Sequence, residues 1–332
     1  PLAKWILRRA IIFVVTVWMG FTITFIISRL LPFDAAEMFI SQLVSQGVQV
    51  SGEELEQMRK TFLELYGLDK PLIIQYLLFL KNYAMGNMGP SFTNFPTPVN
   101  ELIAKALPWT MTLLMTALLI NWTVGNVVGV WAAMTKRRRL SAALEYVAVG
   151  MQPIPFAVLA LAFLILYALV LRLPLTTTGY IYKASPLELI AEMFRRAALP
   201  ATVLVAFGWI GSFLSMKNIA LKMKQDDFVV YMMLQGAPSR TIRNAVFRNS
   251  LIPQYTFLIL GISRIFIGSV LVEYLFNYPG IGLLLRDAVA NGDYNLMLGI
   301  VFMSVFAVGL GAFILDLTYP LIDPRIRYPG AG

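Results

Sequence analysis

Long apolar runs alternate with shorter polar segments along the whole chain. A helix that crosses a membrane needs about 20 mainly apolar residues. Six runs reach that length, at roughly 10–29, 109–134, 146–171, 198–220, 251–275 and 296–319. The pattern therefore predicts an all-α membrane protein with six transmembrane helices.

The third run contains two prolines, Pro153 and Pro155. Proline is tolerated in transmembrane helices where neighbouring groups satisfy the freed backbone carbonyls. A kink at this point is equally consistent with a position beside a transport pathway and with simple helix packing.

The region between the first two runs, 30–107, is expected to form a small helical extracytoplasmic insertion. Ser51 and Glu54 have the spacing of a capping box, which predicts a helix over 52–66 with Gly67 as its stop. The apolar segment 71–85 is too short to cross a membrane, so it suits a helix that lies at the membrane interface. Glycines and prolines between 86 and 98 predict an irregular return to the second span.

The distribution of Lys and Arg predicts the orientation, because cytoplasmic loops carry an excess of basic residues. With six spans and the N-terminus inside, the inside segments hold most of these residues although the outside segments are longer. The inside set is Lys4, Arg8, Arg9, Lys136, Arg137, Arg138, Arg139, Lys217, Lys222, Lys224, Arg240, Arg243, Arg248, Arg325 and Arg327. Both termini are therefore predicted to be cytoplasmic.

Composition supports the membrane interpretation and narrows the chemistry. The 332-residue chain is 58% hydrophobic with a mean hydropathy of +0.71, more apolar than a soluble domain. Lys and Arg outnumber Asp and Glu by 27 to 18, but the positive-inside bias accounts for this excess, so no nucleic-acid partner is predicted. The absence of Cys and His excludes disulfides, thiol and imidazole chemistry and the usual transition-metal ligands.

Motifs of catalysis are absent from the sequence. The chain has no Gly-Lys pair and hence no phosphate-binding P-loop, and neither H-E-x-x-H nor G-x-S-x-G occurs. No span carries the pair of carboxylates expected of an intramembrane aspartyl protease. These absences favour a transport protein over an enzyme.

Three polar residues within the predicted spans are candidates for a substrate pathway or gate. Arg264 lies near the middle of the fifth span, where a charge is costly and is by default a functional hypothesis. The alternative is that Arg264 extends towards the cytoplasmic interface. Asn121 in the second span and Glu273 near the outer end of the fifth are further candidates. Asp316, near the inner end of the sixth span, is expected to form a structural pair with an arginine of the C-terminal tail.

A basic segment, "MLQGAPSRTIRNAVFRNSLIP", separates the fourth and fifth spans. Gly236-Ala237-Pro238 predicts a turn between two short helices at about 226–235 and 239–249. The second helix would expose Arg240, Arg243 and Arg248 on one face and carry Ile242, Val246 and Phe247 on another. Composition alone leaves open whether this segment inserts into a partner protein or is held by anionic lipid.

The chain resembles permeases of the dipeptide/oligopeptide/nickel family of ABC importers over essentially its whole length. Three segments in the first part of the chain are similar to family segments and come in the same order. They are the first span with its following residues, "LYGLDKPLIIQYLLFLKNYAMGNMGPSF" and "PVNELIAKALPWTMTL". "DDFVVYMMLQGAPSRTIRNAVFRNSLIP" resembles the family's cytoplasmic coupling loop. "VEYLFNYPGIGLLLRDAVANGDY" and "DLTYPLIDPRIR" are the most specific matches.

The sequence also departs from the family pattern. Pro32-Phe33-Asp34-Ala35 stands where members usually have Pro-Gly-Asp-Pro, and Arg264 stands where a small or apolar residue is more common. The first half of the coupling loop, 230–235, is far more apolar than usual, which implies a correspondingly apolar groove on the ATPase.

The resemblance implies a type I ABC importer permease in a bacterial or archaeal cytoplasmic membrane, surrounded by membrane lipid. Its partners would be a homologous second permease, two cytoplasmic ATPase subunits that bind ATP and Mg, and an extracytoplasmic solute-binding protein. The chain itself would hold no cofactor. The residues implied in ATPase coupling are Phe228, Gly236, Ala237, Pro238, Ser239, Arg240 and Arg243.

The expected organisation has four parts. They are an N-terminal tail and first span (1–29), the extracytoplasmic insertion (30–107), the core permease domain with its coupling loop at 222–250 (108–320), and a C-terminal tail (321–332). The substrate is an oligopeptide or an oligosaccharide, and the absence of Cys and His disfavours nickel. A secondary transporter or channel subunit is the alternative class, although the sequence shows no internal repeat.

Overall fold

The structure is a computed structural model that describes residues 2–30, 36–37, 40–41, 44, 51–65, 68–172, 185–264 and 270–322. Within these residues the protein is helical, and its only strand-like pairing is an isolated bridge between Pro90 and Pro98. The helices are α1 (Leu2–Leu30), α3 (Gly52–Leu65), α4 (Leu72–Ala84), α5 (Val99–Met134), α6 (Arg138–Met151), α7 (Phe156–Ile165), the π-helix η1 (Leu166–Val170), α8 (Pro186–Met223), α9 (Asp227–Leu234), α10 (Ser239–Arg264), α11 (Val270–Leu275), α12 (Ile281–Ala290) and α13 (Tyr294–Ile322). The prediction of an all-α protein is confirmed for the part of the chain that is described.

Four of these helices are long and apolar enough to cross a membrane: α1, α5, α8 and α13. The first, second, fourth and sixth predicted runs therefore each correspond to one such helix. The third and fifth predicted runs do not each correspond to one such helix among the described residues, so the count of six crossings stays a prediction.

The third predicted run, 146–171, is broken. α6 and the α7–η1 segment pass the span test only as a pair, and they meet at an angle of 100°. Residues 152–155 between them contain Pro153 and Pro155, which cannot donate helical hydrogen bonds. From α6 to η1 the chain runs antiparallel to α8. Glu145 of α6 pairs with Lys217 near the end of α8, and Tyr167 of η1 is hydrogen-bonded to Thr202 in the first half of α8.

The fifth predicted run, 251–275, begins inside a longer helix. α10 starts at Ser239 and continues through Pro253 to Arg264, so the predicted boundary at 249–251 does not exist. Because its first half is polar and basic, α10 is not apolar enough to count as a span among the described residues.

α5 and α8 form the tightest helix pair and run parallel. A Cβ atom at Gly125 would lie 2.5 Å from Cβ of Ser212, and one at Gly129 would lie 2.8 Å from Cβ of Met216. Glycines at this spacing let two backbones approach closely, which is how helices gain packing energy in a membrane.

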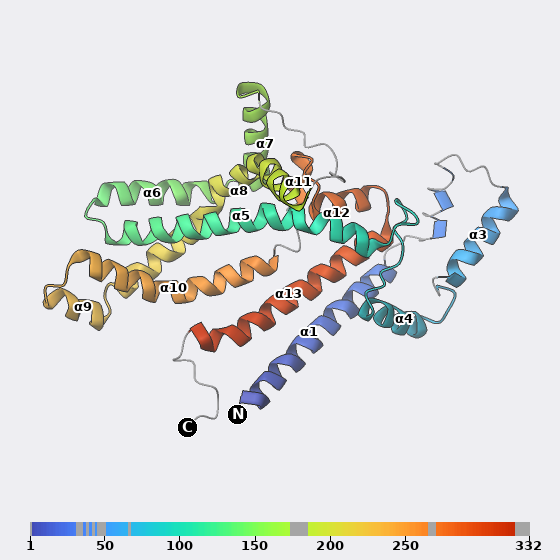
Figure 1. The fold of residues 1–332 in the computed structure, drawn as a ribbon, viewed down its shortest axis with the longest axis horizontal. Coiled ribbons are helices and arrows are strands. Elements are labelled where there is room, and N and C mark those ends of the chain that lie inside the picture. Colours follow the sequence, from blue (N-terminus) through green and yellow to red (C-terminus); the bar gives the residue numbers. More distant parts are fainter. Residues whose placement is uncertain are drawn as a thin grey trace.

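α1 and α13 run antiparallel along the other side of the bundle (Figure 1). The ring of Phe13 stacks on that of Phe313 with centroids 5.3 Å apart, and the ring of Phe21 stacks on that of Phe302 with centroids 3.8 Å apart. Arg9 pairs with Asp316 at 3.0 Å. Asp316 thus has a structural partner, as expected, but the partner lies at the start of α1; Arg325 and Arg327 of the tail lie outside the described residues.

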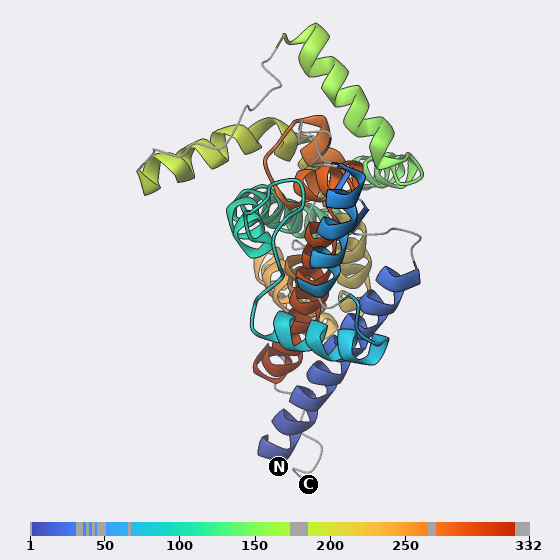
Figure 2. The same cartoon turned by 90° about the vertical axis from the view of Figure 1, so that its right-hand side faces the viewer.

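The described residues between α1 and α5 include the helices α3 and α4 and a return loop, visible at the end of the bundle opposite α9 (Figures 1 and 2). The capping box at the start of α3 is confirmed, since the Ser51 backbone N–H donates to Glu54 Oε2 at 2.7 Å. That bond is the first cause of a lowered pKa for the Glu54 carboxyl. Gly67, the predicted stop, lies outside the described residues. α4 packs through Tyr76 and Phe79 onto Phe25 of α1.

Candidate coupling surface and pathway residues

The loop between α8 and α10 has the helix–turn–helix form that the sequence predicts. Gly236 has φ +73°, a conformation that L side chains rarely adopt. The Gly236 N–H donates to the Met233 carbonyl and the Ala237 N–H donates to the Met232 carbonyl, both at 3.0 Å. These two bonds form a Schellman motif that closes α9 and turns the chain into α10.

Buried side chains fix this loop to the ends of α5 and α8. Val229 of α9 and Ile242 and Val246 of α10 pack in one cluster with Val130 of α5 and Met216 of α8. A movement of the loop would therefore be felt directly by both helices, because packed interiors transmit displacement.

The opposite face of the loop is exposed and mainly apolar. Tyr231 is 61% exposed and Leu234 is 82% exposed, with Phe228 and Val230 beside them. Arg240 and Arg243, in the first part of α10 just after the turn, are also exposed. All seven candidate coupling residues lie on this one loop, with Ala237 half-buried and Phe228, Gly236, Pro238, Ser239, Arg240 and Arg243 exposed.

The three pathway candidates do not come together at one point. Arg264 is the last residue of α10, and its side chain lies outside the described part of the structure. Asn121 sits where α5 crosses α8, with its Nδ2 donating to the Leu204 carbonyl at 3.3 Å. Gly208 leaves room for the Asn121 amide, because a Cβ there would lie 2.1 Å from Nδ2 and the side chain would have to shift.

Glu273 is fully buried and caps a helix. Its Oε2 accepts from the backbone N–H groups of Gly282 at 2.6 Å and Leu283 at 3.2 Å, in the first turn of α12. Thr110 donates its hydroxyl to Glu273 Oε1 at 3.0 Å, and the Ile281 N–H donates to the Thr110 hydroxyl at 2.7 Å. A carboxylate at a helix N-terminus is stabilised by these donors and by the helix dipole. The pathway role of Glu273 stays a prediction beside this structural one.

Comparison with protein-family models decides the class. Residues 125–328 match the family described as the inner membrane component of binding-protein-dependent transport systems, and residues 2–114 match the N-terminal model for the same kind of membrane component. The chain belongs to this family. It is a membrane permease of an importer, which excludes the secondary transporter or channel that the spans alone left open.

Relatives of this permease match over nearly its whole length. The oligopeptide transport system permease protein AppB of Bacillus subtilis is 27% identical, covering 98% of this chain and 100% of the relative. The di/tripeptide transport system permease protein DppB of Pseudomonas aeruginosa is 28% identical over 98% of this chain and 99% of the relative. A probable peptide ABC transporter permease protein of Sinorhizobium fredii, y4tP, is 29% identical over 98% and 99%.

The permease contains a buried carboxylate that the sequence analysis did not single out. Asp293 is fully buried just before α13, where its Oδ1 accepts from the Leu296 N–H at 3.1 Å. Its Oδ2 accepts from the Thr93 N–H at 3.0 Å and the Thr93 hydroxyl at 2.7 Å, and also from the Ser91 hydroxyl. Asp293 therefore ties the return loop to the first turn of α13. In the sequence, Gly292-Asp293-Tyr294 stood out only as part of a segment that resembles the family. The residues that bond Asp293 lie about 200 positions earlier, so local sequence could not show its role.

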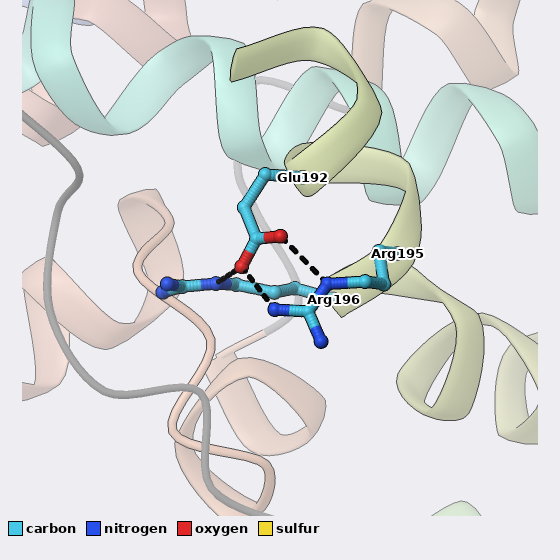
Figure 3. A network of polar contacts seen from close by, with 3 residues as sticks. All are labelled: Glu192, Arg195 and Arg196. Atoms are coloured by element: carbon cyan, nitrogen blue, oxygen red, sulfur yellow. Dashed lines mark hydrogen bonds and ion pairs between the residues drawn. The ribbon is translucent and has the colours of Figure 1, made fainter. Parts of the chain in front are cut away.

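A second charged cluster was also missed, in the first part of α8 (Figure 3). Figure 3 shows the guanidinium groups of Arg195 and Arg196 converging on the carboxylate of Glu192, with Nε of each 2.6 Å from a carboxylate oxygen. The Arg196 guanidinium also lies over the Trp109 ring, 5.5 Å from its centroid. The sequence spacing of these residues, i, i+3 and i, i+4, is the spacing at which opposite charges pair along a helix, and it could have predicted this cluster.

Proposed function

We propose that this permease is one of two membrane subunits of an ATP-driven importer of peptides in a bacterial or archaeal inner membrane. It pairs with a homologous permease, and two cytoplasmic ATPases that bind ATP and Mg dock on the two coupling loops. A solute-binding protein delivers the substrate on the outer side. The relatives' names favour peptides over oligosaccharides, the other class that the sequence left open.

The observation that carries the coupling role is the exposed apolar patch of α9 on a loop packed against α5 and α8. An apolar centre beside charged side chains is the usual anatomy of a protein interface. Tyr231 and Leu234 would fill an apolar groove on the ATPase, and Arg240 and Arg243 would face acidic groups at its edge. Phe228, Gly236, Ala237, Pro238 and Ser239 shape the rest of the contact.

The same proposal includes six crossings with both termini in the cytoplasm and the four-part division of the chain. The bent α6–α7–η1 segment would provide the third crossing and α10 with α11 the fifth. Helix directions support this: α5 and α8 are parallel, while Leu118 and Trp122 of α5 contact Gly261 and Gln254 of α10 in antiparallel order. The insertion before α5 then faces the outside.

Replacing Gly236 by Val tests the coupling role. A β-branched residue at φ +73° is strained by about 1–2 kcal/mol, so the turn between α9 and α10 would change shape. We expect the complex with its ATPases to hydrolyse ATP without importing peptide in reconstituted proteoliposomes. Gly86 is the matched control, because it has φ +74° and, like Gly236, open space around it. Gly86→Val should leave transport coupled, and equal coupling in both variants would contradict the proposal.

A further inference from the structure

An open cavity with a mainly apolar lining and several charged side chains lies at the end of the permease opposite the coupling loop. It has a volume of about 690 Å³ and is lined by the end of α1, α3, α4, the return loop and the start of α13. Small-molecule sites in proteins are mostly clefts of about 300–1,000 Å³ with a few well-placed polar groups. The cavity is therefore large enough for an organic ligand of a few hundred daltons.

The walls of this cavity are held in place by hydrogen bonds. Asp293 anchors the return loop through Ser91 and Thr93, and Asn295 donates its side-chain amide to the Pro90 carbonyl at 3.0 Å. On the opposite wall, Tyr83 of α4 packs against Phe302 of α13, with ring centroids 4.4 Å apart. Burial raises the pKa of the Tyr83 hydroxyl, so this hydroxyl stays uncharged at neutral pH. A preformed site binds without the entropic cost of ordering its walls.

The lining combines three kinds of group. Phe79, Tyr83 and Phe95 provide apolar ring surface, and Asn82 and Asn87 provide amides that both donate and accept. Charges of both signs come from different elements: Arg29 from α1, Glu64 from α3, and Lys70 after it.

A zwitterion with amide bonds matches this set. A short peptide carries an ammonium group at one end, a carboxylate at the other and amides between them. An uncharged sugar would leave the ionic groups of Arg29, Glu64 and Lys70 without a counterpart. A fatty acid or an anionic lipid headgroup would match the basic residues but not Glu64. A zwitterionic lipid headgroup would match charges of both signs, but it has no amide bonds for Asn82 and Asn87.

We infer that this cavity is an outer binding site for a short peptide, with Glu64 facing the peptide's ammonium group and Arg29 and Lys70 facing its carboxylate. The inference rests on the proposed function, because it places substrate on the permease between release from the binding protein and entry into the membrane part. It names a site that is separate from the pathway candidates Arg264, Asn121 and Glu273.

The test measures binding of tri-alanine to the assembled transporter in lipid nanodiscs, without ATP or binding protein. Two analogues remove one charge each: the C-terminal amide and the N-acetyl form. We expect the wild type to prefer free tri-alanine over either analogue by about tenfold, the effect of about 1.4 kcal/mol. Arg29→Gln should weaken the preference over the amide alone, because Lys70 still faces the carboxylate, and Glu64→Gln should abolish the preference over the N-acetyl form alone.

Because each preference is a ratio within one variant, partial loss of folded protein does not change it. Lys81→Gln, on α4 but not on the cavity wall, is the control and should keep both preferences. Wild-type preferences in Arg29→Gln and Glu64→Gln would overturn the inference, as would binding of maltotriose instead of tri-alanine.

ATP-driven peptide import with the binding protein present is measured in parallel. Import without nanodisc binding would refute the outer site and leave the proposed function standing. Nanodisc binding without ATP-driven import would refute the proposed function and leave the site.

Discussion

At the scale of single residues, the buried carboxylates connect distant parts of the chain through hydrogen bonds. Glu273 and Asp293 each satisfy the first turn of a helix and also accept from a hydroxyl far away in sequence, Thr110 and Ser91 respectively. A buried carboxylate is stable only when several donors surround it. These two residues therefore hold α5, α11, α12, α13 and the return loop in register.

Arg264 is the residue where a functional role is most open to test. It ends α10. In the proposed fifth crossing it lies close to mid-membrane, where a cation is costly unless it faces a cavity or a partner. We expect Arg264→Ala to change peptide transport or basal ATPase activity by several-fold while the melting temperature of the complex changes little. Thermal unfolding in detergent and transport assays on the same preparation measure both quantities. Unchanged transport with a lower melting temperature would show that Arg264 is structural.

At the scale of elements, local signals in the sequence predicted local structure well. The capping box at Ser51 and Glu54, the glycine turn at Gly236 and the buried face of α10 at Ile242 all depend on residues a few positions apart. The hydropathy pattern misplaced two boundaries. It joined α6 to α7 across Pro153 and Pro155, and it divided α10 where the helix continues.

The α11–α12 junction could not be predicted, because its geometry depends on α5. A Cβ at Gly280 would lie 2.3 Å from the Thr110 hydroxyl and 2.4 Å from Glu273 Oε2. Nothing in the local sequence shows that Thr110 occupies this space. The family resemblance marked the Pro-Gly-Ile-Gly segment as specific without giving the reason, which is the close approach of the carboxylate to the start of α12.

Gly280→Ala tests this junction. The added methyl group would displace Glu273 or Thr110, and overpacking of this kind costs about 1–3 kcal/mol. We expect a lower melting temperature of the purified permease in detergent. Gly211→Ala in α8 is the control, because its Cβ would meet nothing within 4 Å. If the two variants have the same melting temperature, Glu273 is not held as tightly as the structure indicates.

At the scale of the whole molecule, α10 links the coupling surface to the middle of the bundle. Gln254 is buried near its centre, where it donates to the Ser215 hydroxyl of α8 at 2.9 Å and its carbonyl accepts from the Trp122 indole N–H of α5 at 3.0 Å. α10 is thus attached to both neighbouring helices at one level.

Gln254→Leu removes the side-chain hydrogen bond to Ser215 and leaves the bond from Trp122 to the backbone carbonyl. It should lower transport per ATP hydrolysed about two- to tenfold, since one neutral hydrogen bond contributes roughly 0.5–1.5 kcal/mol. Asn249→Leu is the matched control, because its side-chain amide donates to Ala245 within α10. The ratio of peptide imported to phosphate released in proteoliposomes measures the effect. A similar ratio in both variants would mean that Gln254 does not transmit the motion.

If the packing of Ile242 and Val246 against α5 and α8 loosens when an ATPase docks, Gln254 becomes the pivot of α10, with arms of unequal length on its two sides. At 1.5 Å per residue, its arms are about 22 Å from Ser239 to Gln254 and about 15 Å from Gln254 to Arg264. A displacement of the basic end of α10 by an ATPase would then move Arg264 in the opposite direction, by a distance about one third smaller. We expect spin labels near the two ends of α10 to move in opposite senses when ATP binds, with the larger displacement on the ATPase side.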